Sequence, residues 1–194
     1  FPGNLEAQIL LAWAADDPAA LRRAIERDPL RAFDRVQEYG MVEAVALAAR
    51  MEMPEEPLAR AVARLLADQG VEALEALGPL LDAPADLRVL RLRAVARLVS
   101  GDPDEAISEL DALERLGLDD EWQQRLKRNA HKIAHDPFRR ADLLAKARRW
   151  EETFALCESF LEEHPDDVKM SNNYAWWLAI RTWPSKKASW RSKG

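Results

Sequence analysis

The stretch from Asp136 to Thr182 constrains the fold most, because its apolar residues recur every three or four positions between helix-ending signals. Asp136 and Pro137 suit the first positions of a helix. His164 and Pro165 end one, since the residue before a proline disfavours the helical conformation. This spacing places side chains on one helix face. The stretch therefore predicts three consecutive helices with these apolar residues: Phe138, Ala141, Leu144, Ala145, Thr153, Phe154, Cys157, Phe160, Leu161, Met170, Tyr174, Ala175, Trp177, Leu178 and Ala179.

Small and bulky side chains alternate along these faces, which lets two helices approach closely and interlock. The pattern resembles the tetratricopeptide repeat, a helix hairpin of about 34 residues. The resemblance rests on Ala141, Leu144, Thr153, Cys157, Phe160, Pro165, Leu178 and the run Asn172-Asn173-Tyr174-Ala175-Trp176. An earlier hairpin resembles the family through Ala94, Gly101, Ala106, Leu110 and Leu113. The resemblance implies antiparallel helix hairpins stacked as a right-handed α-solenoid.

The composition independently favours helices throughout the chain. Of the 194 residues, 48% are hydrophobic and 32% are charged, and only 7 are glycine. Ala, Leu, Arg and Glu are common, and these residues favour helix over strand. The sequence therefore predicts an all-α fold of about twelve helices joined by short turns.

Turn-forming residues divide the chain into three predicted segments. Residues 1–57 form N-terminal helical hairpins, which end at the proline-containing loop before Leu58. Residues 58–182 form the tetratricopeptide-like hairpins and continue from the first segment, with Gly70 and Gly101 in turns. Residues 183–194 lose the apolar spacing and are rich in lysine, so a disordered or truncated basic tail is expected. The first residue is Phe1 rather than Met, and we expect the chain to be part of a longer protein.

Charge and cysteine content argue against several classes of protein. The net charge of −6 argues against general nucleic-acid binding, which favours a basic surface. No apolar run is long enough for a membrane-spanning helix, so no membrane insertion is expected. The single cysteine, Cys157, permits no intramolecular disulfide and fits a reducing compartment, which predicts a cytoplasmic location.

No residue cluster indicates catalysis, so neither enzyme activity nor a cofactor is predicted. His131 and His135 lie one helical turn apart, a spacing that can hold zinc, yet no third ligand is identifiable. Exposed or capping histidines are the simpler interpretation, and no metal is predicted. Cys157 lies among apolar residues, whereas a nucleophilic cysteine requires an electropositive and partly exposed setting. It is expected to be a small buried side chain.

The family resemblance implies a concave groove lined by the first helix of each hairpin. Arg, Lys and Asn side chains there suit an acidic peptide or a terminal carboxylate. A solvated surface without a ligand remains the alternative interpretation. The residues that the resemblance places in this partner-binding groove are Arg88, Arg91, His135, Arg139, Lys146, Lys169, Asn172, Asn173 and Trp176.

A second candidate surface lies near the C-terminal end of the chain. Tyr174, Trp177 and Leu178 lie on a predicted helix that no clear partner helix follows. An uncovered aromatic face of this kind suggests contact with another subunit or a further segment. The sequence therefore predicts self-association through these three residues, as in a homodimer.

The function predicted from these features is a non-catalytic scaffold that binds a peptide or helix of another protein in its groove. Two alternatives remain open. The chain could be a homo-oligomerisation or assembly module, or the regulatory helical part of a larger enzyme whose catalytic domain lies outside it.

Overall fold

A computed structural model describes residues 4–39, 42–80 and 86–191, with the backbone alone for residues 38–39, 42–45 and 183–191. The described residues form helices and no strand, which confirms the predicted all-α class. The elements are α1 (Leu5–Ala14), α2 (Pro18–Arg27), α3 (Pro29–Tyr39), α4 (Val42–Arg50), α5 (Pro57–Leu66), α6 (Gly70–Leu77), a short 3₁₀ helix (Gly78–Leu80), α7 (Leu87–Val99), α8 (Pro103–Arg115), α9 (Glu121–Ala134), α10 (Pro137–Lys146), α11 (Trp150–Glu163) and α12 (Val168–Arg191).

Aspartate and proline set the starts of many helices. Asp17 Oδ1 accepts from the backbone N–H groups of Ala19 and Ala20 at 3.0 and 3.1 Å. Asp136 Oδ1 accepts in the same way at the start of α10, at 3.1 Å from both donors. These bonds satisfy N–H groups that have no partner within the helix. Proline occupies the first turn of α2, α5, α8 and α10, where its missing N–H costs little.

The helices α1, α5, α7, α8 and α10 end in the same backbone turn. In each, the residue after the C-cap has a positive φ and donates its N–H to a carbonyl three residues back. The next residue donates to a carbonyl five residues back, which completes the Schellman motif. Because the turn requires the left-handed region, glycine is the usual occupant. The residues with positive φ are Asp16, Asp68, Gly101, Gly117 and Arg148.

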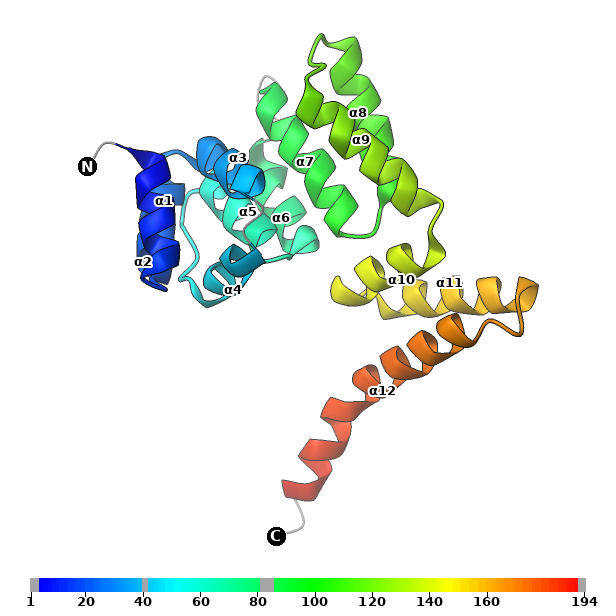
Figure 1. Ribbon diagram of the computed structural model, residues 1–194. Helices are drawn as coiled ribbons and strands as arrows, with labels where there is room; N and C mark the ends of the chain where they lie inside the picture. Colours follow the sequence, from blue (N-terminus) through cyan, green and yellow to red (C-terminus); the bar gives the residue numbers. More distant parts are fainter. Residues whose placement is uncertain (1–3, 40–41, 81–85, 192–194) are drawn as a thin grey trace.

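From α5 onward, the helices pack chiefly against their neighbours in the chain, α5 on α6, α6 on α7, α7 on α8 and α8 on α9. The N-terminal helices also make contacts out of order, since α2 packs on both α4 and α5. The α10–α11 hairpin follows α9, and α12 packs against α11 before it extends away from the other helices (Figure 1).

The apolar core consists of a large N-terminal cluster and smaller clusters further along the chain. The large cluster runs from α1 to α7 and includes buried residues on both sides of residue 57. Buried apolar contacts therefore continue across residue 57, where the sequence predicted the boundary between the first two segments. A second cluster joins α10, α11 and α12, and two smaller ones join α7, α8 and α9. The partly buried Leu126 of α9 packs against three of these clusters.

Two local expectations differ from the structure. A disordered tail was expected from residue 183, but α12 remains helical to Arg191. Apart from Pro184, residues 183–191 include no strong helix breaker, and Lys, Ala and Arg favour helix, which accounts for the continuation. Gly70 begins α6, while Asp68 takes the left-handed conformation in the preceding turn. A Cβ on Gly70 would lie 2.6 Å from Ser100 Oγ, so this glycine permits close approach of α6 to α7.

Candidate partner-binding surface

Arg88 and Arg91 lie near the start of α7, where both make contacts within the chain. Arg88 pairs with Asp86 at 2.9 Å, and this hydrogen bond lowers the pKa of the Asp86 carboxyl below its usual value. Arg91 Nη1 donates to Asp120 Oδ2 at 2.8 Å. Its guanidinium also lies 3.7 Å from the centre of the Trp122 ring. Arg91 therefore ties α7 to α9, and its side chain is only 18% exposed.

The predicted groove residues of α10 are half-exposed and carry weak ion pairs. Lys146 Nζ lies 3.1 Å from Asp142 on the same helix and 4.0 Å from Asp68 in the α5–α6 turn. Burial raises the pKa of Asp68, with Lys146 acting in the opposite direction. Arg139 lies 3.6 Å from Asp136, and its side chain is 61% exposed. Exposed pairs of this kind contribute little stability, so both cations remain available to a ligand.

Of the predicted groove residues of α12, Lys169 contacts α10. Lys169 Nζ lies 4.2 Å from the centre of the Phe138 ring, which is a cation–π contact between the first turns of α12 and α10. Asn172 and Trp176 are exposed, and Asn173 is half-buried. Trp176 is 63% exposed, which is high for so large an apolar side chain.

The structure brings together only part of the predicted groove. The contact between Lys169 and Phe138 places the α10 and α12 residues on adjacent helices. Arg88 lies at the opposite end of α7 from Ser100, to which the α10–α11 hairpin is bonded. At 1.5 Å per residue, that separation is about 18 Å along the helix. Arg88 and Arg91 therefore form a separate patch.

Of the residues predicted for self-association, only Leu178 faces solvent. Trp177 is 6% exposed and belongs to the core cluster of α10, α11 and α12. Tyr174 packs edge-on against Phe154 at 5.6 Å and donates a hydrogen bond to Glu158. Both aromatic side chains therefore lie on the face of α12 that packs against α11. Leu178 is 38% exposed.

Equivalent positions of α10 and α12 differ in burial. Ala141 and Ala145 of α10 are 0% and 6% exposed because they pack in the cluster with α11 and α12, and Leu144 is 4% exposed and lies against Gly101 in the α7–α8 turn. On α12, Ala175, Leu178 and Ala179 are all exposed. The sequence predicted that Ala175 would face a neighbouring helix, but among the described residues no helix covers this side of α12.

The remaining candidate residues show no arrangement suited to catalysis or metal binding. His131 and His135 are both exposed, and the described part of the chain holds no group of three potential metal ligands. Burial, together with the neighbouring Glu158, raises the pKa of the Cys157 thiol to about 11. A thiol with such a pKa is a poor nucleophile at neutral pH. None of the described helices combines the length and apolar character needed to cross a membrane.

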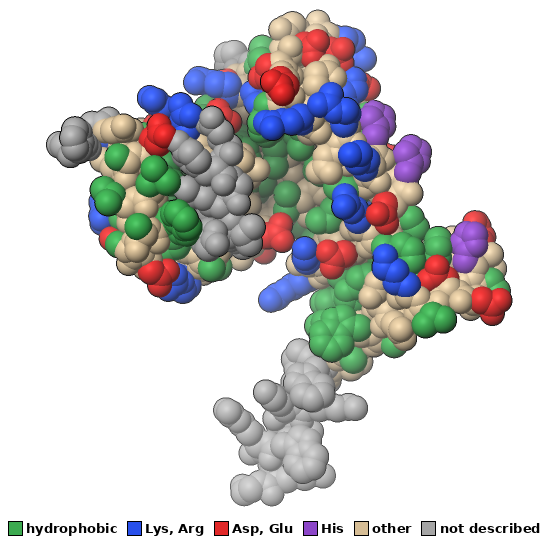
Figure 2. Space-filling model, viewed as in Figure 1, with side chains coloured by type: hydrophobic (Ala, Val, Ile, Leu, Met, Phe, Trp, Pro, Cys, Tyr) green, Lys and Arg blue, Asp and Glu red, His purple; other side chains and the backbone are tan. Residues whose placement is uncertain are grey.

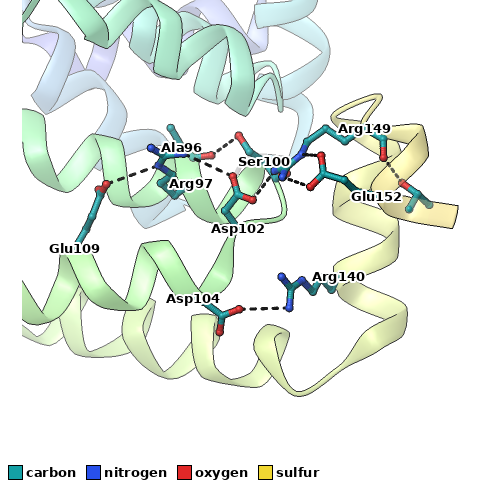
Figure 3. A network of polar contacts seen from close by, with 10 residues as sticks. Ala96, Arg97, Ser100, Asp102, Asp104, Glu109, Arg140, Arg149 and Glu152 are labelled. Atoms are coloured by element: carbon teal, nitrogen blue, oxygen red, sulfur yellow. Dashed lines mark hydrogen bonds and ion pairs between the residues drawn. The ribbon is translucent and has the colours of Figure 1, made fainter. Parts of the chain in front are cut away.

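A polar joint that the sequence did not indicate holds the α10–α11 hairpin against the α7–α8 turn (Figure 3). Arg149 Nη1 donates to the Ser100 carbonyl at 3.0 Å and to Asp102 Oδ1 at 2.5 Å, and its Nε donates to Glu152 at 2.7 Å. Hydrogen bonding to Glu152, and then to Asp102, raises the pKa of the Arg149 guanidinium against the opposing effect of burial. Arg140 adds an ion pair to Asp104 at 3.3 Å. Only the clustered arginines of the α10–α11 turn hinted at this site.

Comparison of the chain with family models, with curated proteins and with solved structures found no match.

Proposed function

We propose that the chain is a non-catalytic scaffold of tetratricopeptide-like hairpins that binds a peptide or helix of another protein. In this proposal the hairpins stack as a short right-handed solenoid, and the binding surface lies on α10 and α12. The single cysteine fits a cytoplasmic setting for such a protein.

The contact between Lys169 and Phe138 is the observation that carries the proposal. Lys169, Asn172 and Trp176 follow one another at three- and four-residue intervals, so they share one face of α12. Because Lys169 reaches the ring on α10, this face continues onto the neighbouring helix, where Arg139 is exposed. We name this surface, Arg139, Lys169, Asn172, Asn173 and Trp176, the α10–α12 patch.

The chemistry of the α10–α12 patch suits an acidic peptide that also carries an apolar side chain. Arg139 and Lys169 supply positive charge, and the two asparagine side chains supply amide donors for carboxylate or backbone oxygens. Trp176 offers a large exposed ring, and exposed tryptophan is a frequent anchor in protein interfaces.

Binding to a peptide array tests the proposal. The array holds acidic, neutral and basic peptides with free C-terminal carboxylates, and the best binder is then measured by fluorescence anisotropy. We expect acidic peptides to be enriched. Asn172→Ala combined with Trp176→Ala should weaken binding at least about tenfold, which corresponds to about 1.4 kcal/mol.

The matched control combines Leu11→Ala with Gln37→Ala, which removes an exposed apolar and an exposed amide side chain from the N-terminal helices. Leu11 is 67% exposed, close to the 63% of Trp176. This control should bind the peptide as the wild type does. If no peptide class is enriched, or if both double variants bind alike, the α10–α12 patch is not the binding site.

An assembly module is the second candidate, and the exposed stripe of Ala175, Leu178 and Ala179 favours it. The equivalent alanines of α10, Ala141 and Ala145, are buried against neighbouring helices. The exposed stripe of α12 therefore has the shape to receive a helix. Light scattering of the purified chain distinguishes the two functions. A concentration-dependent dimer that Leu178→Glu abolishes would favour assembly.

A further inference from the structure

The outer face of α9 carries a row of exposed cations. Arg125, Arg128 and Lys132 are all exposed and are spaced by three and four residues, so they share one side of the helix. The opposite side is buried through Gln123, Ala130 and Ile133. We call these three cations the α9 cationic stripe. Figure 2 shows basic and histidine side chains near one another over this part of the molecule.

The cations of the stripe differ in their pairing from Lys127, their neighbour on the same helix. Lys127, on the same helix, pairs with Asp111 at 2.5 Å and with Glu114 at 2.7 Å. Within the part of the chain that the structure describes, Arg125, Arg128 and Lys132 form no ion pair. This is notable in a chain with 34 acidic and 28 basic residues, where acidic partners are in excess.

Placing three unpaired cations on one face of α9 does not stabilise the isolated protein. Like charges three or four residues apart on a helix destabilise it. The helix dipole favours Lys132, which lies in the last turn, but the effect fades before Arg128 and Arg125. An anionic partner would turn this repulsion into attraction.

We propose that the α9 cationic stripe is a docking site for an acidic helical segment of a partner protein. Arg125 and Lys132 are two helical turns apart, about 10 Å along the axis. A partner helix with glutamates every three or four residues presents carboxylates at the same intervals, so each cation can pair with one. Lys132 and Arg139 line one hollow where α9 meets α10, so the stripe adjoins the α10–α12 patch there, while Lys169, Asn172, Asn173 and Trp176 lie on α12.

The surroundings of the stripe favour an acidic protein segment over nucleic acid. Glu121 at the start of α9 and Asp136 just after its end lie at the two ends of the stripe. Asp111 and Glu114 of α8 lie alongside, bonded to Lys127. A long phosphate backbone would extend past Glu121 and Asp136 at the two ends of the stripe. A peptide helix of two or three turns fits between these two carboxylates. Nucleic-acid binding also depends on neutralising many phosphates, which three cations do poorly.

The experiment measures binding of the full chain to a labelled helical peptide of about sixteen residues that carries glutamate every third or fourth position only in its central three turns. Fluorescence anisotropy is recorded at about 20 mM and about 200 mM NaCl, because salt screens exposed charges. We expect binding at low salt that weakens at least about tenfold at high salt. Arg125→Glu, Arg128→Glu and Lys132→Glu together should abolish it.

The matched control reverses three exposed arginines on separate helices, Arg23→Glu, Arg31→Glu and Arg115→Glu, which changes the net charge equally. It should retain binding within about threefold, because scattered charges do not align with a helix. Circular dichroism and thermal melting confirm that each variant folds. If the triple reversal fails to fold, Arg125→Gln with Arg128→Gln replaces it and should weaken binding at least about tenfold.

Three outcomes would overturn the proposal. The peptide shows no binding at low salt, or the stripe and control variants lose binding equally, or a double-stranded DNA of similar charge binds more tightly than the peptide. The third outcome would assign the stripe to nucleic acid. Asn172→Ala combined with Trp176→Ala, both on α12, should leave this binding unchanged, so the two proposals fail separately.

Discussion

The guanidinium of Arg149 donates a hydrogen bond to the backbone carbonyl of Ser100 at 3.0 Å, between residues 49 positions apart in the sequence. The same nitrogen also bonds to Asp102, whose side chain is only 14% exposed. Both acceptors belong to the turn that joins α7 to α8, and the donor lies in the turn that joins α10 to α11. One side chain therefore fixes two hairpins relative to each other.

Arg149→Ala should lower the free energy of unfolding by about 2–4 kcal/mol, because it leaves the Ser100 carbonyl without this donor and Asp102 with only the longer 3.8 Å ion pair to Arg97. Urea unfolding followed by circular dichroism measures the change. Arg139→Ala is the control, since it removes an exposed cation from the neighbouring helix and should cost less than about 0.5 kcal/mol. Equal losses for the two variants would show that the joint contributes nothing specific.

Gly101→Ala should destabilise the protein more than Gly117→Ala. Both glycines have a φ of +87°, so alanine is strained at either position by about 1–2 kcal/mol. Only at Gly101 would the added Cβ meet another side chain, at 2.9 Å from Leu144. We expect this contact to cost about 1–3 kcal/mol more. The thermal unfolding midpoints of the two variants give the comparison directly, and coincident midpoints would contradict the packing of Leu144 on this turn.

Trp177→Ala and Trp176→Ala should differ sharply although the residues are adjacent. Trp177 is 6% exposed, and its removal from the core should cost about 3–5 kcal/mol. Trp176 is 63% exposed, and its removal should change stability by less than about 0.5 kcal/mol. Chemical unfolding of the two variants tests the orientation of α12 on α11. A larger loss for Trp176→Ala would mean that the helix is rotated.

Cys157 should make stability fall with pH on the alkaline side. Burial raises the pKa of this thiol from 9.0 to about 11, so between these values the folded chain keeps the proton that the unfolded chain loses. The unfolded state then binds fewer protons, and the free energy of unfolding decreases as the pH rises, by up to about 2.7 kcal/mol. Its contribution is fully present below pH 9.0 and is lost by about pH 11.

Urea unfolding of wild type and Cys157→Ala across this pH range measures the effect. The difference between their free energies of unfolding at each pH gives the contribution of the thiol. The lysines and tyrosines that titrate in the same range contribute equally to both proteins and cancel. The wild-type curve should fall more steeply than that of the variant. Parallel curves would show that the folded thiol titrates normally.

Local signals in the sequence predicted most helix starts and the burial of several side chains. Asp136 and Pro137 mark the start of α10 because capping and the fixed φ of proline act within one turn. The burial of Cys157 follows from helical spacing on the apolar side of α11. These properties depend on neighbours a few residues away, which is why sequence reasoning reaches them.

Contacts between distant segments were not predictable in the same way. Arg91 has the sequence appearance of a groove residue, yet it pairs with Asp120 and lies over Trp122 because α9 packs beside α7. The role of Arg149 likewise depends on how two hairpins meet. The left-handed conformations of Asp68 and Arg148 were also missed, since glycine is the residue that usually marks this backbone state and neither residue is one.

The main chain alone sets the shared ending of α1, α5, α7, α8 and α10. The hydrogen bonds that define the ending involve only main-chain atoms, and Asp, Gly and Arg all occupy its left-handed position. The path of the chain out of each helix is therefore largely independent of the side chain at that point. A hairpin bounded by two such endings could be duplicated, removed or exchanged while the exit direction of the flanking helices is kept.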